Sequence, residues 1–297
     1  MTVLAIDVGG TNLRAALVDR GIVRQRTHAP TEPAKVGAAV ENLVAGLLNR
    51  CPELQPLAVG IGLPEYVQDG RTTSNEVVDW TASDADRISR AVRAATGAEV
   101  PVVVEADVRC GAVAEHSALD DPQRDSLLYV SWGTGLSSAL VFPGGQVWTG
   151  ARGEALALGE WRDDVGHRLE DIASGRGIEH AYLESTGELL DAVAIHARAL
   201  AGDAVASELF QRSGRALGRA IRNLVQVLDP HVVVLGGGLG SSDHLGRAAL
   251  LAELAELSAG PARPGFPPVQ PARTGTDAGL LGAAIVAERA AQRHAPG

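Results

Sequence analysis

Two blocks of this 297-residue sequence match each other without a gap. In each block an apolar run reaches a glycine turn, and a second apolar run follows the turn. At the constant offset that takes Gly10 to Gly133, the other matches are Thr11 with Thr134, Leu13 with Leu136, Ala16-Leu17-Val18 with Ala139-Leu140-Val141, and Gly21 with Gly144. The pattern predicts an internal duplication: two related α/β halves that each open with a β-hairpin. Two such halves predict a cleft between them as the ligand site.

Strands and helices alternate through both halves. Beyond the hairpin strands at 3–8, 13–18, 127–131 and 138–142, the predicted strands cover 57–62, 100–105 and 232–235, and the predicted helices cover 36–48, 83–97, 112–116, 169–178, 189–200, 204–228 and 278–289. Ser83 is the predicted N-cap of its helix, which Gly97 ends. The last helix is expected to pack on the first half, and the proline-rich stretch 261–271 to form a surface loop. The predicted domains are therefore 1–118 with about 278–297, and 119–277.

Composition restricts the class of protein. Hydrophobic residues make up 45% and charged residues 21% of the chain, as in a folded globular protein. The net charge of −10 argues against nucleic acid as a partner, because phosphate contacts need Lys and Arg. Two cysteines cannot form a disulfide framework, and neither a leader nor a membrane-spanning apolar run is recognisable. The sequence thus predicts a cytoplasmic protein without membrane contact.

A single lysine, Lys35, excludes two large classes of phosphotransferase. A P-loop needs a lysine inside its glycine loop, and a protein kinase needs one on a strand beside the phosphates. Lys35 lies in Glu-Pro-Ala-Lys-Val-Gly, which fits neither position.

Three glycine turns that each follow an apolar strand are candidate phosphate cradles. They are Gly9-Gly10, Gly133-Thr134-Gly135 and Gly236-Gly237-Gly238. Glycines let phosphate oxygens approach backbone N–H groups, Thr11 and Thr134 add hydroxyl donors, and Asp7 beside the first turn suits Mg²⁺ through water. The alternative for each turn alone is a purely structural role. A dinucleotide site at the third turn is disfavoured, because Ser241 takes the third glycine position of that fingerprint.

Asp107 stands where the predicted strand 100–105 gives way to a helix. One interpretation is an N-cap. The other is a general base for phosphoryl transfer to an alcohol, kept ionised by the helix N-terminus and directed into the cleft.

These motifs resemble the ROK sugar kinases over essentially the whole chain. Asp7-Val-Gly-Gly-Thr-Asn12 resembles the first phosphate motif of the family, Trp132-Gly-Thr-Gly135 the second, and 229–238 the adenosine-side motif. Ser74–Trp80 resembles the segment whose asparagine, here Asn75, holds sugar hydroxyls. Leu169–Gly175 resembles the segment that supplies a sugar-contact glutamate, here Glu170, and Glu105-Ala-Asp107 resembles Glu-Asn-Asp with Asp107 as base.

The resemblance implies two ribonuclease-H-like (actin-like ATPase) domains, ATP with Mg²⁺, a sugar acceptor and a homodimer. The nucleotide residues implied are Asp7, Gly9, Gly10, Thr11, Asn12, Gly133, Thr134, Gly135, Gly236, Gly237 and Gly238. The acceptor residues implied are Glu65, Asn75, Glu105, Asp107, Glu160 and Glu170.

Departures from the family lie on the acceptor side. Ala106 replaces the asparagine before the base, Glu65 replaces a glycine, and Ala157 replaces a glutamate. Either Glu160 or His167 takes the place of a histidine, and the zinc cysteines are missing, so no zinc site is expected. If Glu65 and Glu160 face the cleft, they favour a cationic amino group; the alternative for both is solvent exposure.

The sequence thus predicts an ATP-dependent kinase of a sugar-like acceptor, with an amino sugar or a cyclitol favoured over glucose. Two alternatives stay open. One is a non-catalytic sugar-binding regulator, and the other is a glucokinase that uses polyphosphate, which would need a basic groove.

Overall fold

The computed structural model describes residues 1–258 and 265–294, and the chain divides into two compact units. The first unit comprises Met1–Ala118, Val147–Ala155 and Thr276–Gly297, and the second comprises Leu119–Gln146 and Leu156–Gly275. The short segment 147–155 thus groups with the first unit, although the sequence places it in the second predicted domain. None of the described helices is long and apolar enough to cross a membrane.

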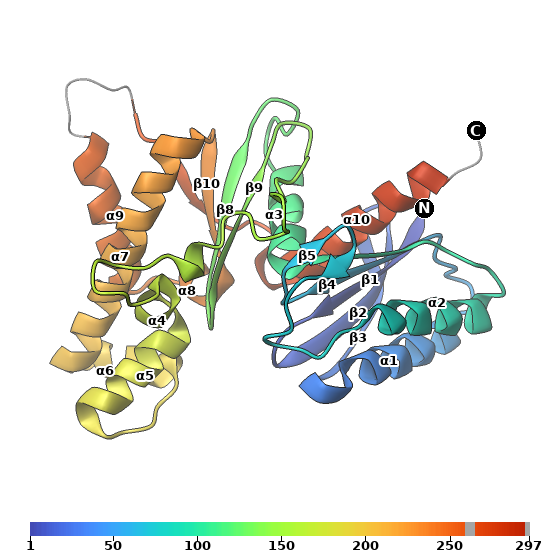
Figure 1. Ribbon diagram of the computed structural model, residues 1–297, viewed down its shortest axis with the longest axis horizontal. Helices are drawn as coiled ribbons and strands as arrows, with labels where there is room; N and C mark the ends of the chain where they lie inside the picture. Colours follow the sequence, from blue (N-terminus) through green and yellow to red (C-terminus); the bar gives the residue numbers. More distant parts are fainter. Residues whose placement is uncertain (259–264, 295–297) are drawn as a thin grey trace. The chain divides into compact units, whose positions relative to one another are not determined.

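The first unit is built on a five-stranded sheet with strand order β3-β2-β1-β4-β7 (Figure 1). Its strands are β1 (Thr2–Val8), β2 (Asn12–Asp19), β3 (Ile22–Pro30), β4 (Val59–Leu63) and β7 (Val102–Ala106). The first three strands form antiparallel pairs, whereas β4 pairs in parallel with both β1 and β7. A small ribbon, β5 (Val67–Gln68) with β6 (Arg71–Thr72), follows β4.

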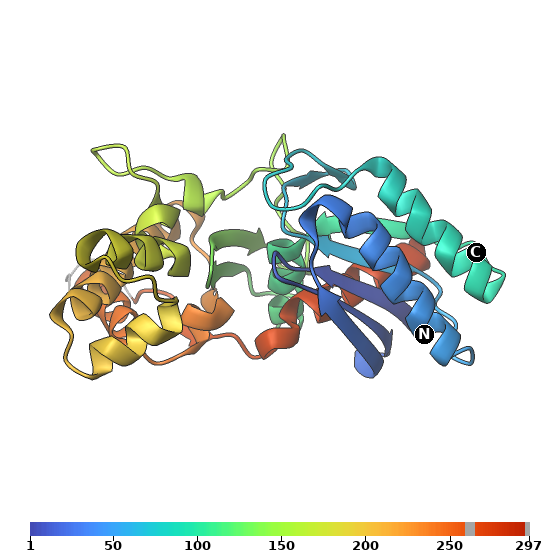
Figure 2. The ribbon, with the colours of Figure 1, turned by 90° about the horizontal axis from the view of Figure 1, so that it is seen from below.

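Helices cover both faces of this sheet, as Figures 1 and 2 show. The helices are α1 (Val36–Arg50), α2 (Ala82–Thr96), α3 (Asp107–Ser117) and α10 (Ala278–His294), with short 3₁₀ turns at Pro33–Lys35 and Gly275–Asp277. Alternate residues of β1 serve the two faces: Leu4 and Ile6 join the core under α1 and α2, while Val3 and Ala5 join the core under α10. The last described helix thus packs on the first unit.

The second unit repeats this topology. Its sheet has the order β11-β10-β8-β9, with β8 (Leu127–Trp132), β9 (Leu136–Val141), β10 (Val232–Gly236) and β11 (Val269–Pro271). β8 and β9 form an antiparallel hairpin, and β10 pairs in parallel with both β8 and β11. The strands β2, β1, β4 and β7 of the first unit are related in the same way, which confirms the predicted duplication.

Helices pack against the second sheet around a core that includes Trp132, Leu217, Ile221 and Leu250. The helices of this unit are α4 (Leu169–Ala173), α5 (Gly175–Thr186), α6 (Ala192–Leu200), α7 (Ala204–Leu228), α8 (Gly237–Ser241) and α9 (Leu245–Ser258), with a 3₁₀ turn at Leu158–Glu160. Of these, α5 and α6 pack with α7 around a separate cluster that includes Ile178, Ile195 and Phe210.

Three local predictions were wrong. The predicted helix 169–178 is two helices, because Ser174 ends α4 and its Oγ accepts a hydrogen bond from Gly177 N as the N-cap of α5. Thr81, not Ser83, is the N-cap of α2, where Asp84 accepts hydrogen bonds from the Thr81 backbone N–H and hydroxyl. Val269–Pro271 is not loop but the edge strand β11, a position where proline is tolerated; residues 261–264 lie outside the described residues.

Candidate active site

Three carboxylates of the first unit gather at one edge of its sheet. Asp7 is the second-to-last residue of β1 and the parallel partner of Gly62 in β4, Glu65 lies just beyond β4, and Asp107 follows β7 directly. Because β1, β4 and β7 are adjacent and parallel, their carboxyl ends share one edge, where ligands of open α/β sheets bind.

Asp107 has a strongly perturbed environment at this edge. Ala106 is the N-cap of α3, so Asp107 is its first residue, and its Oδ1 accepts a hydrogen bond from Val108 N at 2.5 Å. Burial, followed by the charge of Asp7, raises the pKa of Asp107 to about 7; Glu65 also raises it, and the Val108 bond opposes the rise. The expectation that the helix N-terminus keeps this side chain ionised was wrong, because desolvation outweighs the favourable N–H groups.

Asp7 is held by a residue that the sequence analysis missed. Arg14, its direct partner in the β1–β2 hairpin, donates from Nη2 to Asp7 Oδ2, and Nη1 of Arg14 donates to the Thr276 carbonyl. The Arg14 guanidinium also lies 3.8 Å from the Asp277 carboxylate at the start of α10. Burial raises the pKa of Asp7, while Arg14 counters that rise. The sequence did contain a signal for this pair, because the predicted hairpin places the charged residue Arg14 opposite Asp7.

Part of the backbone of the first glycine turn is hydrogen-bonded within the first unit. Gly9 N donates to Asn12 O at 2.9 Å, and Thr31 Oγ1 donates to Gly9 O at 2.7 Å. The Gly9 N–H is therefore already used, whereas Gly10, Thr11 and Asn12 are exposed on the surface of the unit.

Glu65 does not present a free carboxylate, so neither a cleft-facing anion that favours a cationic amino group nor the alternative of solvent exposure describes it. It is only 6% exposed, and its Oε1 accepts hydrogen bonds from Val77 N at 2.6 Å and Val78 N at 2.9 Å. Its Oε2 accepts from Glu76 N at 3.0 Å and from the Ser74 hydroxyl. The side chain thus organises the loop that carries Asn75.

The other two first-unit candidates also make contacts within the unit. Asn75 is exposed; its Nδ2 donates to Asp79 at 3.2 Å and its Oδ1 accepts from Trp80 N at 3.4 Å. Glu105 forms an ion pair at 2.9 Å with the buried Arg109, which also donates to the carbonyls of Val67 and Gly153. Glu105 therefore helps hold the segment 147–155 to its unit.

The second and third glycine turns touch each other in the second unit. A Cβ on Gly133 would lie 3.4 Å from Gly238 N. Leu136 N, at the end of the second turn, donates to Glu170 Oε2 at 2.7 Å, so Glu170 lies against the glycine turn. Two of these glycines have a structural reason. A Cβ on Gly236 would lie 2.2 Å from the Tyr129 hydroxyl, and Gly237 has a φ of +78°, in the left-handed region that favours glycine.

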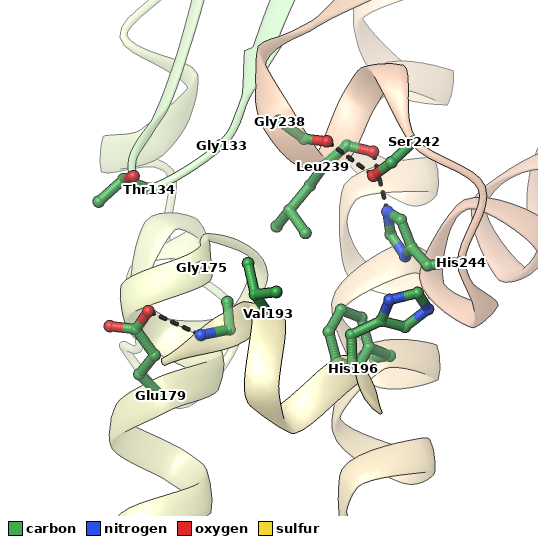
Figure 3. A pocket seen from close by; sticks show the side chains of 12 residues that line it. Gly133, Thr134, Gly175, Glu179, Val193, His196, Gly238, Leu239, Ser242 and His244 are labelled. Carbon is green, nitrogen blue, oxygen red and sulfur yellow. Dashed lines mark hydrogen bonds between the residues drawn. The ribbon is translucent and has the colours of Figure 1, made fainter. Parts of the chain in front are cut away.

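A cavity of about 430 Å³ opens beside these turns within the second unit (Figure 3). Its lining comprises Gly133, Thr134, Gly175, Glu179, Ala192, Val193, His196, Phe210, Gly238, Leu239, Ser242 and His244. Its volume is in the range of small-molecule and cofactor sites. Apolar walls beside two glycine turns fit a nucleoside whose phosphates reach the turns.

Two histidines on the cavity wall were missed in the sequence analysis, because they are far apart in the chain: His196 is in α6, and His244 is in the segment before α9. His244 Nε2 donates to Leu239 O at 2.8 Å and its Nδ1 accepts from Gly246 N at 3.1 Å. Burial lowers the pKa of His244, which favours the neutral ring that the bond from Gly246 N requires. His196 stacks at an angle on Phe210, with ring centroids 5.4 Å apart, and lies on the same wall in Figure 3.

Glu160 and His167 lie on the surface of the second unit. Glu160 pairs with Arg168 at 3.0 Å, so this glutamate is not a free anion either. His167 pairs with Asp163 at 3.1 Å inside an exposed loop. Which of them takes the place of the family histidine stays a prediction.

Metal ligands are sparse in the described part of the chain. Among residues 1–258 and 265–294, no group of three or more His, Cys, Asp or Glu side chains is arranged to hold a metal ion. Cys51 and Cys110 are buried free thiols, and burial raises the pKa of Cys110. Mg²⁺ takes oxygen ligands and keeps several of its waters, so the Asp7 carboxylate would hold such an ion through water.

Comparison with known proteins identifies the family. The sequence model of the ROK family matches residues 3–290. The N-acetyl-D-glucosamine kinase of Pasteurella multocida is 31% identical over 305 positions, which cover 94% of this chain and 97% of that protein. The N-acetylmannosamine kinase of Shigella flexneri is 31% identical over 300 positions, which cover 97% and 99%.

A solved structure agrees with this result. A ROK family glucokinase from Streptomyces griseus, in complex with glucose and AMPPNP, matches with a TM-score of 0.78 and 25% identity, covering 97% of this chain and 100% of that one. The chain therefore belongs to the ROK family, and its two units have the actin-like ATPase fold of these sugar kinases.

Proposed function

We propose that this protein is an ATP-dependent kinase that transfers the γ-phosphoryl group to a hydroxyl of an amino sugar. The observation that carries the proposal is Asp107, a carboxylate with a pKa of about 7 at the carboxyl edge of the first sheet. A general base works best when its pKa is near the operating pH, because it is then both ionised and basic.

Each unit contributes one part of the chemistry. In the first unit, Asp107 accepts the proton of the attacking hydroxyl, while the Val108 N–H fixes the orientation of its carboxylate. Asp7 would hold Mg²⁺ through water, and the ion would supply charge neutralisation for the phosphates. In the second unit, the 430 Å³ cavity takes the adenosine, and Gly133, Thr134 and Gly238 line its phosphate side. Gly10, Thr11 and Asn12 supply the remaining phosphate contacts.

An uncharged N-acetylated amino sugar is favoured over a cationic one. Glu65 accepts hydrogen bonds from four donors, and Glu160 is paired with Arg168, so neither attracts an ammonium group. The two kinases that are 31% identical act, by their names, on N-acetyl-D-glucosamine and N-acetylmannosamine. Asn75 and Glu170 are the proposed contacts to the acceptor hydroxyls, and a cyclitol is the second acceptor class.

The test is release of ADP from Mg-ATP with N-acetylglucosamine, N-acetylmannosamine, glucosamine, mannosamine, glucose and myo-inositol as acceptors. A second series replaces ATP with polyphosphate. Turnover with one of the N-acetylated sugars, abolished in Asp107→Asn, is the expected result. Turnover with polyphosphate alone would support the polyphosphate kinase instead. Sugar binding in a thermal-shift assay without any turnover would support a regulator.

A further inference from the structure

Glu65 stands out because its buried charge contacts no cation in the described residues, only the backbone and one hydroxyl of a single loop. We propose that Glu65 is a positioning residue for acceptor binding, which holds residues 74–78 in the conformation that presents Asn75. This inference rests on the proposed function and assigns a role to a residue that departs from the family pattern.

The first step of the argument is the number of bonds that converge on one carboxylate. The N–H groups of Glu76, Val77 and Val78 and the hydroxyl of Ser74 all donate to Glu65, two to each oxygen. Three consecutive N–H groups that point at one anion form a backbone anion nest. Without the carboxylate these donors would lose their partner, which destabilises this conformation of the loop.

The second step is that the loop is tied down on both sides. Tyr66 N, directly after Glu65, donates to Ser74 Oγ at 2.9 Å, so the hydroxyl links the two segments. At the far end, Asp79 N donates to Pro33 O at 3.0 Å. Asn75 lies between these anchors, and its side chain is oriented by Asp79 and Trp80.

The third step connects the loop to the first phosphate turn. A Cβ on Gly10 would lie 3.3 Å from Val77 Cγ1, so Val77 packs directly on that glycine. The Val77 N–H makes the shortest of the three backbone bonds to Glu65, at 2.6 Å. A single carboxylate thereby fixes both the acceptor loop and the residue that covers the phosphate turn.

The experiment is a graded series of variants: Ser74→Ala, Glu65→Gln and Glu65→Met. Ser74→Ala removes one donor. Glu65→Gln keeps the shape of the side chain, but an NH₂ group takes the place of one carboxylate oxygen. That NH₂ group cannot accept the two hydrogen bonds that the oxygen accepts in the wild type. Glu65→Met keeps the length and accepts none of the four bonds. Glu53→Gln, an exposed site in the same unit, is the matched control for loss of one charge.

We expect the KM for the acceptor to rise about tenfold in Glu65→Gln and about 100-fold in Glu65→Met, since each tenfold step corresponds to about 1.4 kcal/mol. The dissociation constant for adenosine is expected to stay within about twofold, because the proposed adenosine cavity belongs to the second unit and adenosine has no phosphate to reach the Gly10 turn. Hydrogen exchange at the Val77 and Val78 amides should accelerate in the same order. Glu53→Gln should resemble the wild type in all three measurements.

Each outcome has a separate meaning. Faster amide exchange in Glu65→Met with an unchanged acceptor KM would overturn the positioning role, since the loop would then be free to move without consequence. Unchanged exchange would overturn the anchor itself. Absence of turnover by the wild-type protein with every acceptor would contradict the proposed function, and the acceptor part of this inference with it.

Discussion

Arg14 bonds the carboxylate of Asp7 from the position directly opposite it in the β1–β2 hairpin. The pair is asymmetric, because Asp7 is buried whereas the Arg14 side chain is 36% exposed. Arg14 also bonds the Thr276 carbonyl, so the same guanidinium links the proposed Mg²⁺ carboxylate to the start of α10. The strand register of the hairpin thus determines that the Arg14 guanidinium lies beside the Asp7 carboxylate.

Arg14→Gln should destabilise the first unit at neutral pH by about 1–3 kcal/mol. Removing one partner of a buried pair leaves the other charge uncompensated, and the exposure of Arg14 reduces the full cost of about 3–5 kcal/mol. Urea unfolding of Arg14→Gln, Asp7→Asn and the double variant measures the coupling. Arg14→Gln should cost less in the Asp7→Asn background; equal costs in both backgrounds would show that the pair contributes nothing.

Asp107→Asn should lower kcat by about 10²–10⁴-fold, the usual contribution of a positioned general base. The variant keeps the shape of the side chain, so the dissociation constants for ADP and the acceptor should change little. Asp86→Asn, an exposed carboxylate in α2, is the control and should retain wild-type turnover. Wild-type kcat in Asp107→Asn would remove this residue from the reaction.

The acceptor kcat/KM should rise with pH, reach half its maximum near pH 7 and then level off. Asp107 must be ionised to accept a proton, and its pKa is about 7 because burial and the charge of Asp7 disfavour the anion. Glu65 adds to the rise, so the midpoint should move to lower pH in Glu65→Gln. A wild-type midpoint near the ordinary aspartate value of about 3.9 would contradict the electrostatic environment described here.

The same shift predicts a pH-dependent stability difference between the wild type and Asp107→Asn. The folded-state pKa of Asp107 lies above the unfolded value, so its favourable contribution is complete at low pH and is lost as pH rises towards 7. The wild type should therefore lose up to about 4 kcal/mol relative to the variant between pH 4 and pH 8, at about 1.36 kcal/mol per pKa unit. Chemical denaturation at the two pH values measures it; a constant difference would contradict the raised pKa.

Two neighbouring glycines should respond oppositely to alanine. A Cβ on Gly238 meets no atom within 4 Å, whereas one on Gly236 would lie 2.2 Å from the Tyr129 hydroxyl. Gly238→Ala should therefore fold normally while its methyl group reduces ATP affinity, by about tenfold or 1.4 kcal/mol. Gly236→Ala should lower the melting temperature. Calorimetric titration with ATP and thermal unfolding separate the two effects, and unchanged ATP affinity in Gly238→Ala would argue against this cavity as the nucleotide site.

The features that the sequence predicted best are those that depend on residues close together in the chain. The glycine-turned hairpins, the junction at Asp107 and the glycine that ends α2 depend on neighbours in the chain, and the repeat of the Gly10 block at Gly133 revealed the duplicated topology. β3 escaped prediction because it is an exposed edge strand rich in polar residues, without an apolar alternation. β11 escaped because prolines surround it.

The electrostatics of the site could not be read from the sequence. The pKa of Asp107 depends on how deeply the edge of the sheet is buried and on Asp7, which lies 100 positions away in the chain. Glu65 looked like a free anion because its partners are mainly backbone N–H groups, which every sequence contains and which no residue pattern marks. His196 and His244 meet on one wall only after α6 and the segment before α9 have packed together.

The path of the chain sets an order on its synthesis. The chain passes between the two units at four points, and the first unit is complete only when residues 276–294 have been made. Until then the β1 face that carries Val3 and Ala5 lacks the alanine-rich side of α10 that covers it in the folded protein. On the ribosome, the first sheet must therefore wait with one apolar face uncovered while the whole second unit is translated. The closing of the first core thus depends on residues 276–294, although β1 comes first in the chain.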